Sequence, residues 1–134
     1  DAFGIDASSG LLEEALRRHP GVRFEAHALP ELSRLGRSLY VNVLCETVIM
    51  HLPKPQAMAA VVRLTELLTR GGTLYLSWRI TEGTDRRDEE GRLYAAFKTD
   101  LVRESLGDLE TLVDERIVSA SSGNVLHRII ARRV

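Results

Sequence analysis

The chain has 134 residues, 44% of them apolar and 28% charged, which suits one soluble globular domain with a hydrophobic core and excludes a disordered protein. Eighteen basic residues against nineteen acidic ones leave no basic excess for binding a nucleic-acid backbone. No apolar run approaches the roughly 18 residues that span a bilayer, so we expect neither a membrane nor a nucleic acid as partner. The single cysteine, Cys45, excludes a disulfide framework, so we expect a cytoplasmic protein.

The first third of the chain alternates between strand and helix patterns. Residues 3–6 form a short apolar strand that ends in a carboxylate, and Ser8 or Ser9 can cap the helix that follows. Residues 22–26 alternate like a strand. Residues 39–45 are rich in valine and leucine without alternation, which is typical of a parallel strand covered on both faces. This run is the best candidate for a central strand.

The rest of the chain continues the alternation and ends in a hairpin. In order, the patterns predict a helix that begins near Pro53, a buried strand over residues 73–78, a charged loop over residues 79–92, a helix from Leu93 to Gly107, and strands over residues 112–120 and 125–132. The turn residues between the last two strands predict that they pair antiparallel. We expect the charged loop to be functional or mobile because of its length. No linker or repeat interrupts the chain, so we predict a single domain.

The acid at the end of the first strand, Asp6, is the most informative residue. An acid at the carboxyl end of the second strand of a nucleotide-binding sheet can accept hydrogen bonds from both hydroxyls of a ribose. Capping of the following helix is the alternative use of this side chain. The glycine-rich turn that should precede such an acid by about twenty residues would lie upstream of Asp1, so we expect the domain to be incomplete at its N-terminus.

The order of the elements and four segments resemble the class I S-adenosylmethionine-dependent methyltransferases, over essentially the whole chain. The segments are Gly4 to Ser8 for the ribose-binding second strand, Ala28-Leu29-Pro30 after the third strand, Tyr40 to Leu52 for the fourth strand, and Arg70 to Leu74 for the turn into the fifth. Three positions depart from the family's pattern. Val41 and His27 stand where many members carry an acid, and Arg70 stands in place of a proline.

The resemblance implies an α/β fold, a Rossmann-like three-layer sandwich whose mostly parallel sheet ends in an antiparallel hairpin. In the family the first strand lies between the second and the fourth, so we expect an upstream segment, or a strand exchanged in a homodimer, to fill that place. The implied cofactor is S-adenosyl-L-methionine, held by Asp6, Ala7 and Ser8 at the ribose, by Ala28 and Leu29 at the adenine, and by Cys45, Glu46 and Thr47 at the methionine end.

Further side chains are candidates for the site of the methyl acceptor, and each has a plainer alternative. His51 has an ordinary pKa near neutrality and can act as a base, or it can cap or orient the helix that follows. Trp78 can form a wall for the substrate or pack in the core. The groups that suit a carboxylate or phosphate on a small substrate are Arg79, Arg86, Arg87, Arg92 and Tyr94, unless the loop is simply solvated. Cys45 can be a buried thiol, and Glu46 and Thr47 a surface turn.

The resemblance implies an enzyme, a small-molecule methyltransferase that moves a sulfonium methyl group to nitrogen, oxygen or sulfur by in-line displacement. No spacing of histidines suits a metal site, and no serine-hydrolase motif is present. The first alternative is a nicotinamide-dependent oxidoreductase, which also binds a ribose through an acid after its second strand. The C-terminal hairpin argues against it. The second alternative is a non-catalytic methyltransferase-like partner subunit, and Asp6 argues against that.

Overall fold

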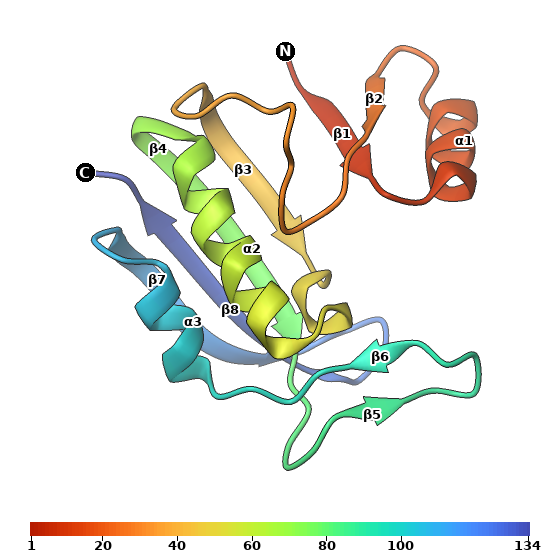
Figure 1. Cartoon of the computed structure of the whole chain (residues 1–134), viewed down its shortest axis with the longest axis vertical. Helices are drawn as coiled ribbons and strands as arrows, with labels where there is room; N and C mark the ends of the chain where they lie inside the picture. Colours follow the sequence, from red (N-terminus) through yellow and green to blue (C-terminus); the bar gives the residue numbers. More distant parts are fainter. The chain divides into compact units, whose positions relative to one another are not determined.

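The computed structural model describes residues 1–134, which divide into two units (Figure 1). The first unit is Asp1–Leu35 and the second is Gly36–Val134, and each is described by itself. None of the helices is long and apolar enough to cross a membrane.

The first unit is a β–α–β element. Strand β1 (Phe3–Asp6) pairs in parallel with β2 (Arg23–Ala26), and helix α1 (Ser9–Arg18) connects the two strands. The Ser8 hydroxyl accepts a hydrogen bond of 3.3 Å from an amide in the first turn and so caps α1. The predicted strand, capped helix and second strand are confirmed.

The second unit contains a four-stranded sheet in the order β3, β4, β8, β7. These strands are β3 (Tyr40–Glu46), β4 (Leu68–Arg79), β7 (Glu110–Val118) and β8 (Val125–Arg132). The pair β3–β4 is parallel, whereas β4–β8 and β8–β7 are antiparallel. The predicted C-terminal hairpin is therefore confirmed. The prediction of a mostly parallel sheet is not, because the hairpin adds two antiparallel pairings and makes this sheet mixed.

Two helices of the second unit contact each other beside the sheet, α2 (Lys54–Leu67) and α3 (Thr99–Ser105) (Figure 1). The buried residues of α2 recur at helical spacing and include Ala57, Ala60, Val61 and Leu64. The sheet contributes Leu74, Leu76 and Ile129, each at most 1% exposed. The hydrophobic core of this unit thus lies between the helices and the sheet.

The predicted start of the last helix is wrong. Leu93 and Tyr94 form a short strand, β6, which pairs antiparallel with β5 (Arg86–Arg87) inside the loop expected to have no regular structure. Two long-range hydrogen bonds hold this segment extended: the amide of Ala95 donates to the carbonyl of Met50 at 2.8 Å, and a 2.8 Å bond joins the Leu93 carbonyl to a histidine ring. Tertiary contacts override the helical spacing of the apolar residues, and α3 begins only at its Thr99.

The strand predicted to be central, β3, lies at the edge of its sheet. It is parallel to β4 as predicted, but β4 is its one partner. Consequently its apolar side chains are not covered on both faces: Val41 is 64% exposed and Leu44 is 70% exposed. Strand β3 therefore has the composition of a buried strand, but one of its edges has no hydrogen-bonded partner strand.

The strand β4 begins five residues earlier than predicted, directly after α2. The segment predicted as the turn between them, Arg70-Gly71-Gly72, lies inside β4, opposite a shift in the β3–β4 register. A side chain on Gly72 would meet three backbone carbonyl oxygens at 2.9 to 3.0 Å. The glycine therefore permits a close approach of two backbones rather than a turn.

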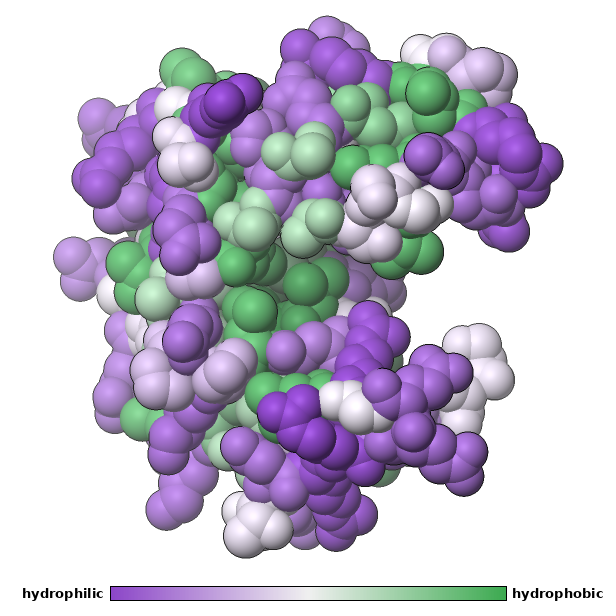
Figure 2. Space-filling view, turned by 45° about the vertical axis from the view of Figure 1, so that its right-hand side comes forward, coloured by the Kyte–Doolittle hydropathy of each residue, from purple (hydrophilic) through white to green (hydrophobic).

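The mobility of the charged loop is still a prediction. Residues 82–92 are all exposed, and Figure 2 shows hydrophilic side chains gathered at the lower part of the view, where β5 and β6 lie. We expect backbone amides of residues 82–91 to exchange with deuterium at least tenfold faster than those of β4 and β8, because so little apolar surface is buried there. Exchange as slow as in β4 would contradict this and indicate a rigid structural hairpin.

Candidate functional site

The parallel strands of the first unit bring the predicted ribose and adenine residues to one edge. The amide of His27 donates to the carbonyl of Asp6 at 3.2 Å, so Asp6 lies beside the segment that leads into Ala28 and Leu29. One oxygen of the Asp6 carboxylate accepts a 2.8 Å hydrogen bond from the amide of Ser8, and the other oxygen has no partner in the protein. Asp6 thus shapes the start of α1 and keeps one oxygen for a ligand.

In the second unit, a cavity of about 380 Å³ lies at the carboxyl end of β3, the end at which open α/β sheets bind ligands. This smaller cavity includes part of the short 3-10 helix η1 (Ile49–His51). Its lining residues are Glu46, Thr47, Met50, His51, Arg79, Arg92, Tyr94, Ser119, Ser121, Ser122, Asn124 and Leu126. Six predicted site residues, Glu46, Thr47, His51, Arg79, Arg92 and Tyr94, therefore share one cavity.

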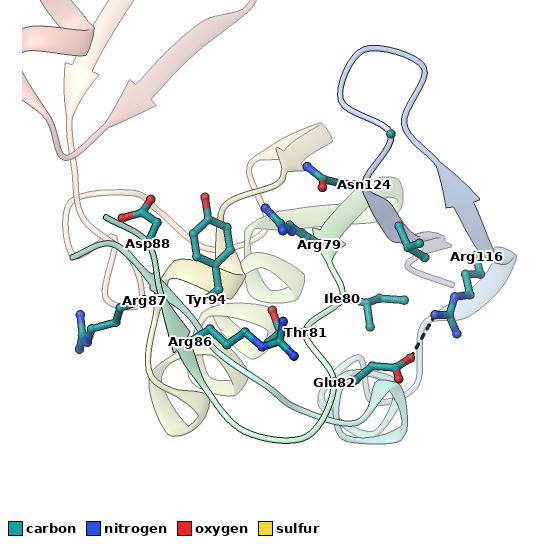
Figure 3. Close-up of a pocket in the computed structure, with 12 residues that line it drawn as sticks. Arg79, Ile80, Thr81, Glu82, Arg86, Arg87, Asp88, Tyr94, Arg116 and Asn124 are labelled. Atoms are coloured by element: carbon teal, nitrogen blue, oxygen red, sulfur yellow. Dashed lines mark hydrogen bonds and ion pairs between the residues drawn. The ribbon is translucent and has the colours of Figure 1, made fainter. Parts of the chain in front are cut away.

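A larger cavity, of about 530 Å³, shares Arg79, Tyr94 and Asn124 with the smaller one (Figure 3). Its other lining residues come from the charged loop and the β7–β8 hairpin: Ile80, Thr81, Glu82, Arg86, Arg87, Asp88, Arg116, Gly123 and Val125. The Arg79 guanidinium carbon lies 4.8 Å from the centre of the Tyr94 ring. This cation–π pair, with Asn124, forms the common wall of the two cavities.

His51 is held as a neutral ring with a defined proton position. Its Nδ1 lies 2.8 Å from the carbonyl oxygen of Leu93, and because a carbonyl only accepts, the proton is on Nδ1 and Nε2 carries a lone pair. Burial lowers the pKa of His51, and the nearby Arg92 and Arg79 charges act in the same direction, opposed by the Leu93 bond and the Asp88 charge. The edge of the ring meets Tyr94 at 4.9 Å between centroids. His51 does not cap α2, whose N-cap, Pro53, has no side-chain cap.

Thr47, in the smaller cavity, has a strained backbone. Its φ is 52°, in the left-handed region that a β-branched residue rarely adopts, and its amide donates to the carbonyl of Ser77 at 2.9 Å. Such strain is typical of functional sites, where the surrounding structure imposes it. This observation supports a binding role for Thr47 over an ordinary surface turn.

Thr47→Gly should raise the stability of the protein. Relief of the left-handed strain, worth about 1 to 3 kcal/mol, exceeds the entropic cost of glycine, so we expect a gain of about 1 kcal/mol in the free energy of unfolding. Thr47→Ala keeps a β-carbon and is the matched control. Denaturant unfolding measures both variants, and equal stabilities would show that the backbone at this position is unstrained.

Two predicted site residues of the second unit line neither cavity. Trp78 is 1% exposed and stacks on His127 at 5.0 Å between ring centroids, so the structure places it in the core and not in a substrate wall. Cys45 is 6% exposed, and burial raises the pKa of its thiol to about 12. A neutral, buried thiol offers no charge or strong donor to a cofactor.

The four predicted arginines differ in their surroundings. Arg79 is half-buried, whereas Arg86, Arg87 and Arg92 are exposed. Arg87 donates to the carbonyl of Gly91 at 2.8 Å and, in Figure 3, points away from the other labelled side chains. Arg79 and Arg86 have neither an ion pair nor a hydrogen bond from their side chains.

Sequence analysis missed the contribution of the β7–β8 turn. It interpreted Ser121, Ser122 and Asn124 only as turn residues and Ser119 as part of a strand, yet Asn124 lines both cavities and the three serines line the smaller one. The predicted hairpin itself contained a signal for this contribution. An antiparallel β8 starts beside the end of β4, with Leu126 opposite Arg79, so the turn before it must lie at the carboxyl edge of the parallel strands.

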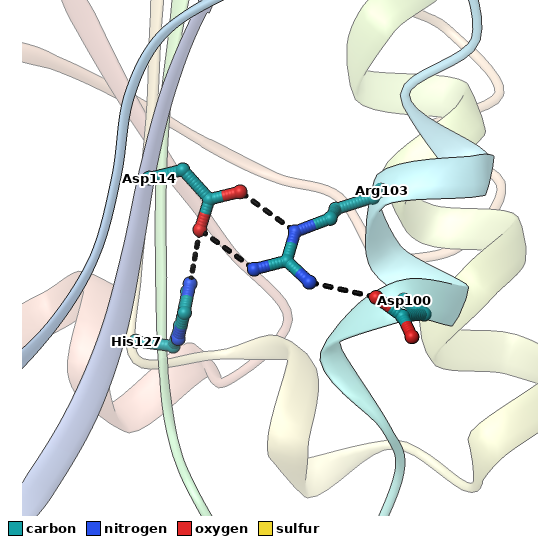
Figure 4. Close-up of polar contacts among 4 residues, drawn as sticks. All are labelled: Asp100, Arg103, Asp114 and His127. Atoms are coloured by element: carbon teal, nitrogen blue, oxygen red, sulfur yellow. Dashed lines mark hydrogen bonds and ion pairs between the residues drawn. The ribbon is translucent and has the colours of Figure 1, made fainter.

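An ion-pair network joins α3 to the β7–β8 hairpin (Figure 4). Arg103 of α3 donates from Nε to Asp114 of β7 at 2.7 Å and from a terminal nitrogen to Asp100 at 2.7 Å. Asp114 also lies 2.6 Å from Nε2 of His127, the ring stacked on Trp78. The network fixes the position of the hairpin relative to the helix.

This network should make the protein less stable as the pH is lowered. The Arg103 guanidinium holds the pKa of Asp114 at about 2, below its ordinary value of 3.8. The folded-state pKa is depressed, so the stabilisation is complete above about pH 4 and is lost as the pH falls toward 2. Because solvent screens this partly exposed pair, we expect Asp114→Asn to cost about 1 kcal/mol at pH 7 and much less at pH 2.5. Urea unfolding tests this, with Asp108→Asn as control; a loss that does not change with pH would contradict it.

No protein-family model and no curated protein sequence matches the chain, but solved structures match its fold. The 1,6-didemethyltoxoflavin-N1-methyltransferase of Burkholderia thailandensis, with bound 1,6-didemethyltoxoflavin and S-adenosylhomocysteine, is similar at a TM-score of 0.70 and 21% identity, over 97% of this chain and 60% of that one. Magnesium protoporphyrin IX methyltransferase of Synechocystis PCC 6803, with bound S-adenosylhomocysteine, is similar at a TM-score of 0.73 and 22% identity. The match covers 98% of this chain and 64% of that one.

A third similar structure is the [4+2]-cyclase SpnF, at a TM-score of 0.69 and 14% identity, over 98% of this chain and 65% of that one. The chain spans less than two thirds of each of these three proteins. At these identities the likeness concerns the fold, and the same fold serves more than one reaction. The chain has the fold of the class I S-adenosylmethionine-dependent methyltransferases.

Proposed function

We propose that the protein is an S-adenosylmethionine-dependent methyltransferase that acts on a small molecule. The fold supports this, because solved structures with that fold hold S-adenosylhomocysteine or S-adenosylmethionine. The observation in this chain that carries the proposal is the free carboxylate oxygen of Asp6 at the carboxyl edge of β1, a fit for a ribose hydroxyl. The other oxygen already forms the turn into α1.

The residues that the resemblance implies for the cofactor would each keep a separate role. Asp6, Ala7 and Ser8 would hold the ribose, with Ala28 and Leu29 along the adenine. Glu46 and Thr47 would meet the methionine end, and Cys45 would contribute only its backbone, since its side chain is buried. When bound, the cofactor supplies a methyl group on a positively charged sulfur, which a lone pair on the acceptor can displace.

His51 would act as the base for an acceptor that carries a proton on nitrogen or oxygen. Its Nε2 lone pair is free, and the lowered pKa keeps the ring neutral at neutral pH. The acceptor atom would bond to the methyl carbon as the carbon–sulfur bond of the sulfonium breaks, and the acceptor's proton would pass to Nε2, so the positive charge would end on the imidazole. The Leu93 carbonyl, which accepts from Nδ1, then stabilises the imidazolium.

Ligand-dependent stability tests the cofactor assignment. We expect S-adenosylhomocysteine at 100 times its dissociation constant to stabilise the protein by about 2.7 kcal/mol, seen as a rise in melting temperature. NAD at the same concentration should give no rise. A rise with NAD alone would favour the oxidoreductase, and no rise with either ligand would favour the non-catalytic subunit.

A further inference from the structure

The larger cavity carries an excess of positive charge. Four arginines line it, Arg79, Arg86, Arg87 and Arg116, against two acids, Glu82 and Asp88, which gives four minus two, or a net charge of +2. The smaller cavity has two arginines and one acid, a net charge of +1. The protein as a whole has a net charge of -1, so this excess is local to the two cavities.

Both acids of the larger cavity already have partners. Glu82 pairs with Arg116 at 3.2 Å, the one dashed contact in Figure 3. One oxygen of the Asp88 carboxylate accepts from the amides of Glu90 and Arg92, at 3.0 and 2.9 Å, and closes the tip of the loop. Neither acid neutralises Arg79 or Arg86.

Arg79 is therefore a half-buried cation without a counter-ion. Its guanidinium carbon lies over the Tyr94 ring, and no side-chain hydrogen bond or ion pair uses its N–H groups, which remain free to donate. That planar fork matches the two oxygens of a carboxylate or phosphate. In Figure 3 the Arg79 side chain lies between Tyr94 and Asn124, the residues that line both cavities with it, and the Arg86 side chain runs below Tyr94 toward Thr81.

We propose that the methyl acceptor is a small organic molecule with a carboxylate or phosphate group, and that Arg79, assisted by Arg86, binds this group. The inference rests on the proposed function. Because Arg79 also lines the smaller cavity, an anion bound to it leaves the rest of the molecule beside His51 and Thr47. Arg79 would then determine specificity by orienting the acceptor toward the base.

Benzoate and phenyl phosphate are suitable probes, with benzyl alcohol as the uncharged counterpart. We expect both anions to shift backbone amide resonances of residues 79–81, 92–94 and 124 in the protein, and the alcohol to leave them unchanged. Arg79→Gln should weaken binding of the anions at least tenfold. Arg79→Lys, which keeps the charge and loses the fork, should weaken it less. Arg70→Gln, an exposed arginine at the far end of β4 that lines neither cavity, is the matched control and should bind normally.

Binding of S-adenosylhomocysteine is measured separately on the same variants and should not depend on Arg79. Anion binding without cofactor binding would support the anion site and overturn the proposed function. Cofactor binding without anion binding would support the proposed function and overturn the anion site. Shifts that the alcohol produces equally, or an equal loss in Arg79→Gln and Arg70→Gln, would overturn the anion site, because they would reflect general attraction to a charged surface.

Discussion

His51→Asn is expected to lower kcat by about 100- to 10,000-fold, the range typical of a lost general base. The asparagine amide can replace Nδ1–H as donor to the Leu93 carbonyl, so the local structure should persist while the Nε2 base is absent. The wild-type kcat should fall on the acid side of the lowered pKa of His51, where the ring becomes protonated. The variant should lose this acid limb.

Steady-state kinetics over pH 5 to 9 measure both effects once an acceptor is known. His19→Asn, at the end of α1, is the control for a surface histidine. A variant that keeps the wild-type kcat would show that His51 only anchors the segment at Leu93. A variant with reduced kcat and an unchanged acid limb would show that another group is the base.

The order of strands and helices was predictable because its signals are local. The Ser8 cap, the apolar spacing of α2 and the turn before β8 each lie within a few residues of the element they define. Leu93 and Tyr94 show where such signals fail. Their spacing suits a helix, but hydrogen bonds to η1, which join residues 42 and 45 positions apart in the chain, hold this segment extended. No local pattern contains that information.

The candidate site was predictable in part. Glu46, Thr47 and His51 follow one strand, and the family's order of strands places them where a ligand binds. The neighbouring residues Trp78 and Arg79 were both predicted to line the site, yet successive side chains of a strand point to opposite faces. Arg79 reaches the cavities, and Trp78 therefore faces the core. This period-2 rule would have separated the two residues from the sequence alone.

Asp6→Asn is expected to weaken binding of S-adenosylhomocysteine by roughly 30- to 900-fold, which corresponds to about 2 to 4 kcal/mol for charge-assisted hydrogen bonds to the ribose. Asparagine still offers one oxygen to the amide of Ser8, so the turn into α1 should survive and the melting temperature should change little. Asp6→Ala loses both functions and should bind weakly and melt earlier. Isothermal titration calorimetry measures the affinities.

The comparison of the two variants separates the ligand role of Asp6 from its structural role. Glu13→Gln, on an exposed position of α1, removes a nearby charge without touching the strand edge and is the matched control. If Asp6→Asn binds as tightly as the wild type while Asp6→Ala does not, the carboxylate acts only through the turn at Ser8. The ribose assignment, and with it the main support for the cofactor, would then be wrong, because the oxygen without a protein partner would have no ligand to accept from.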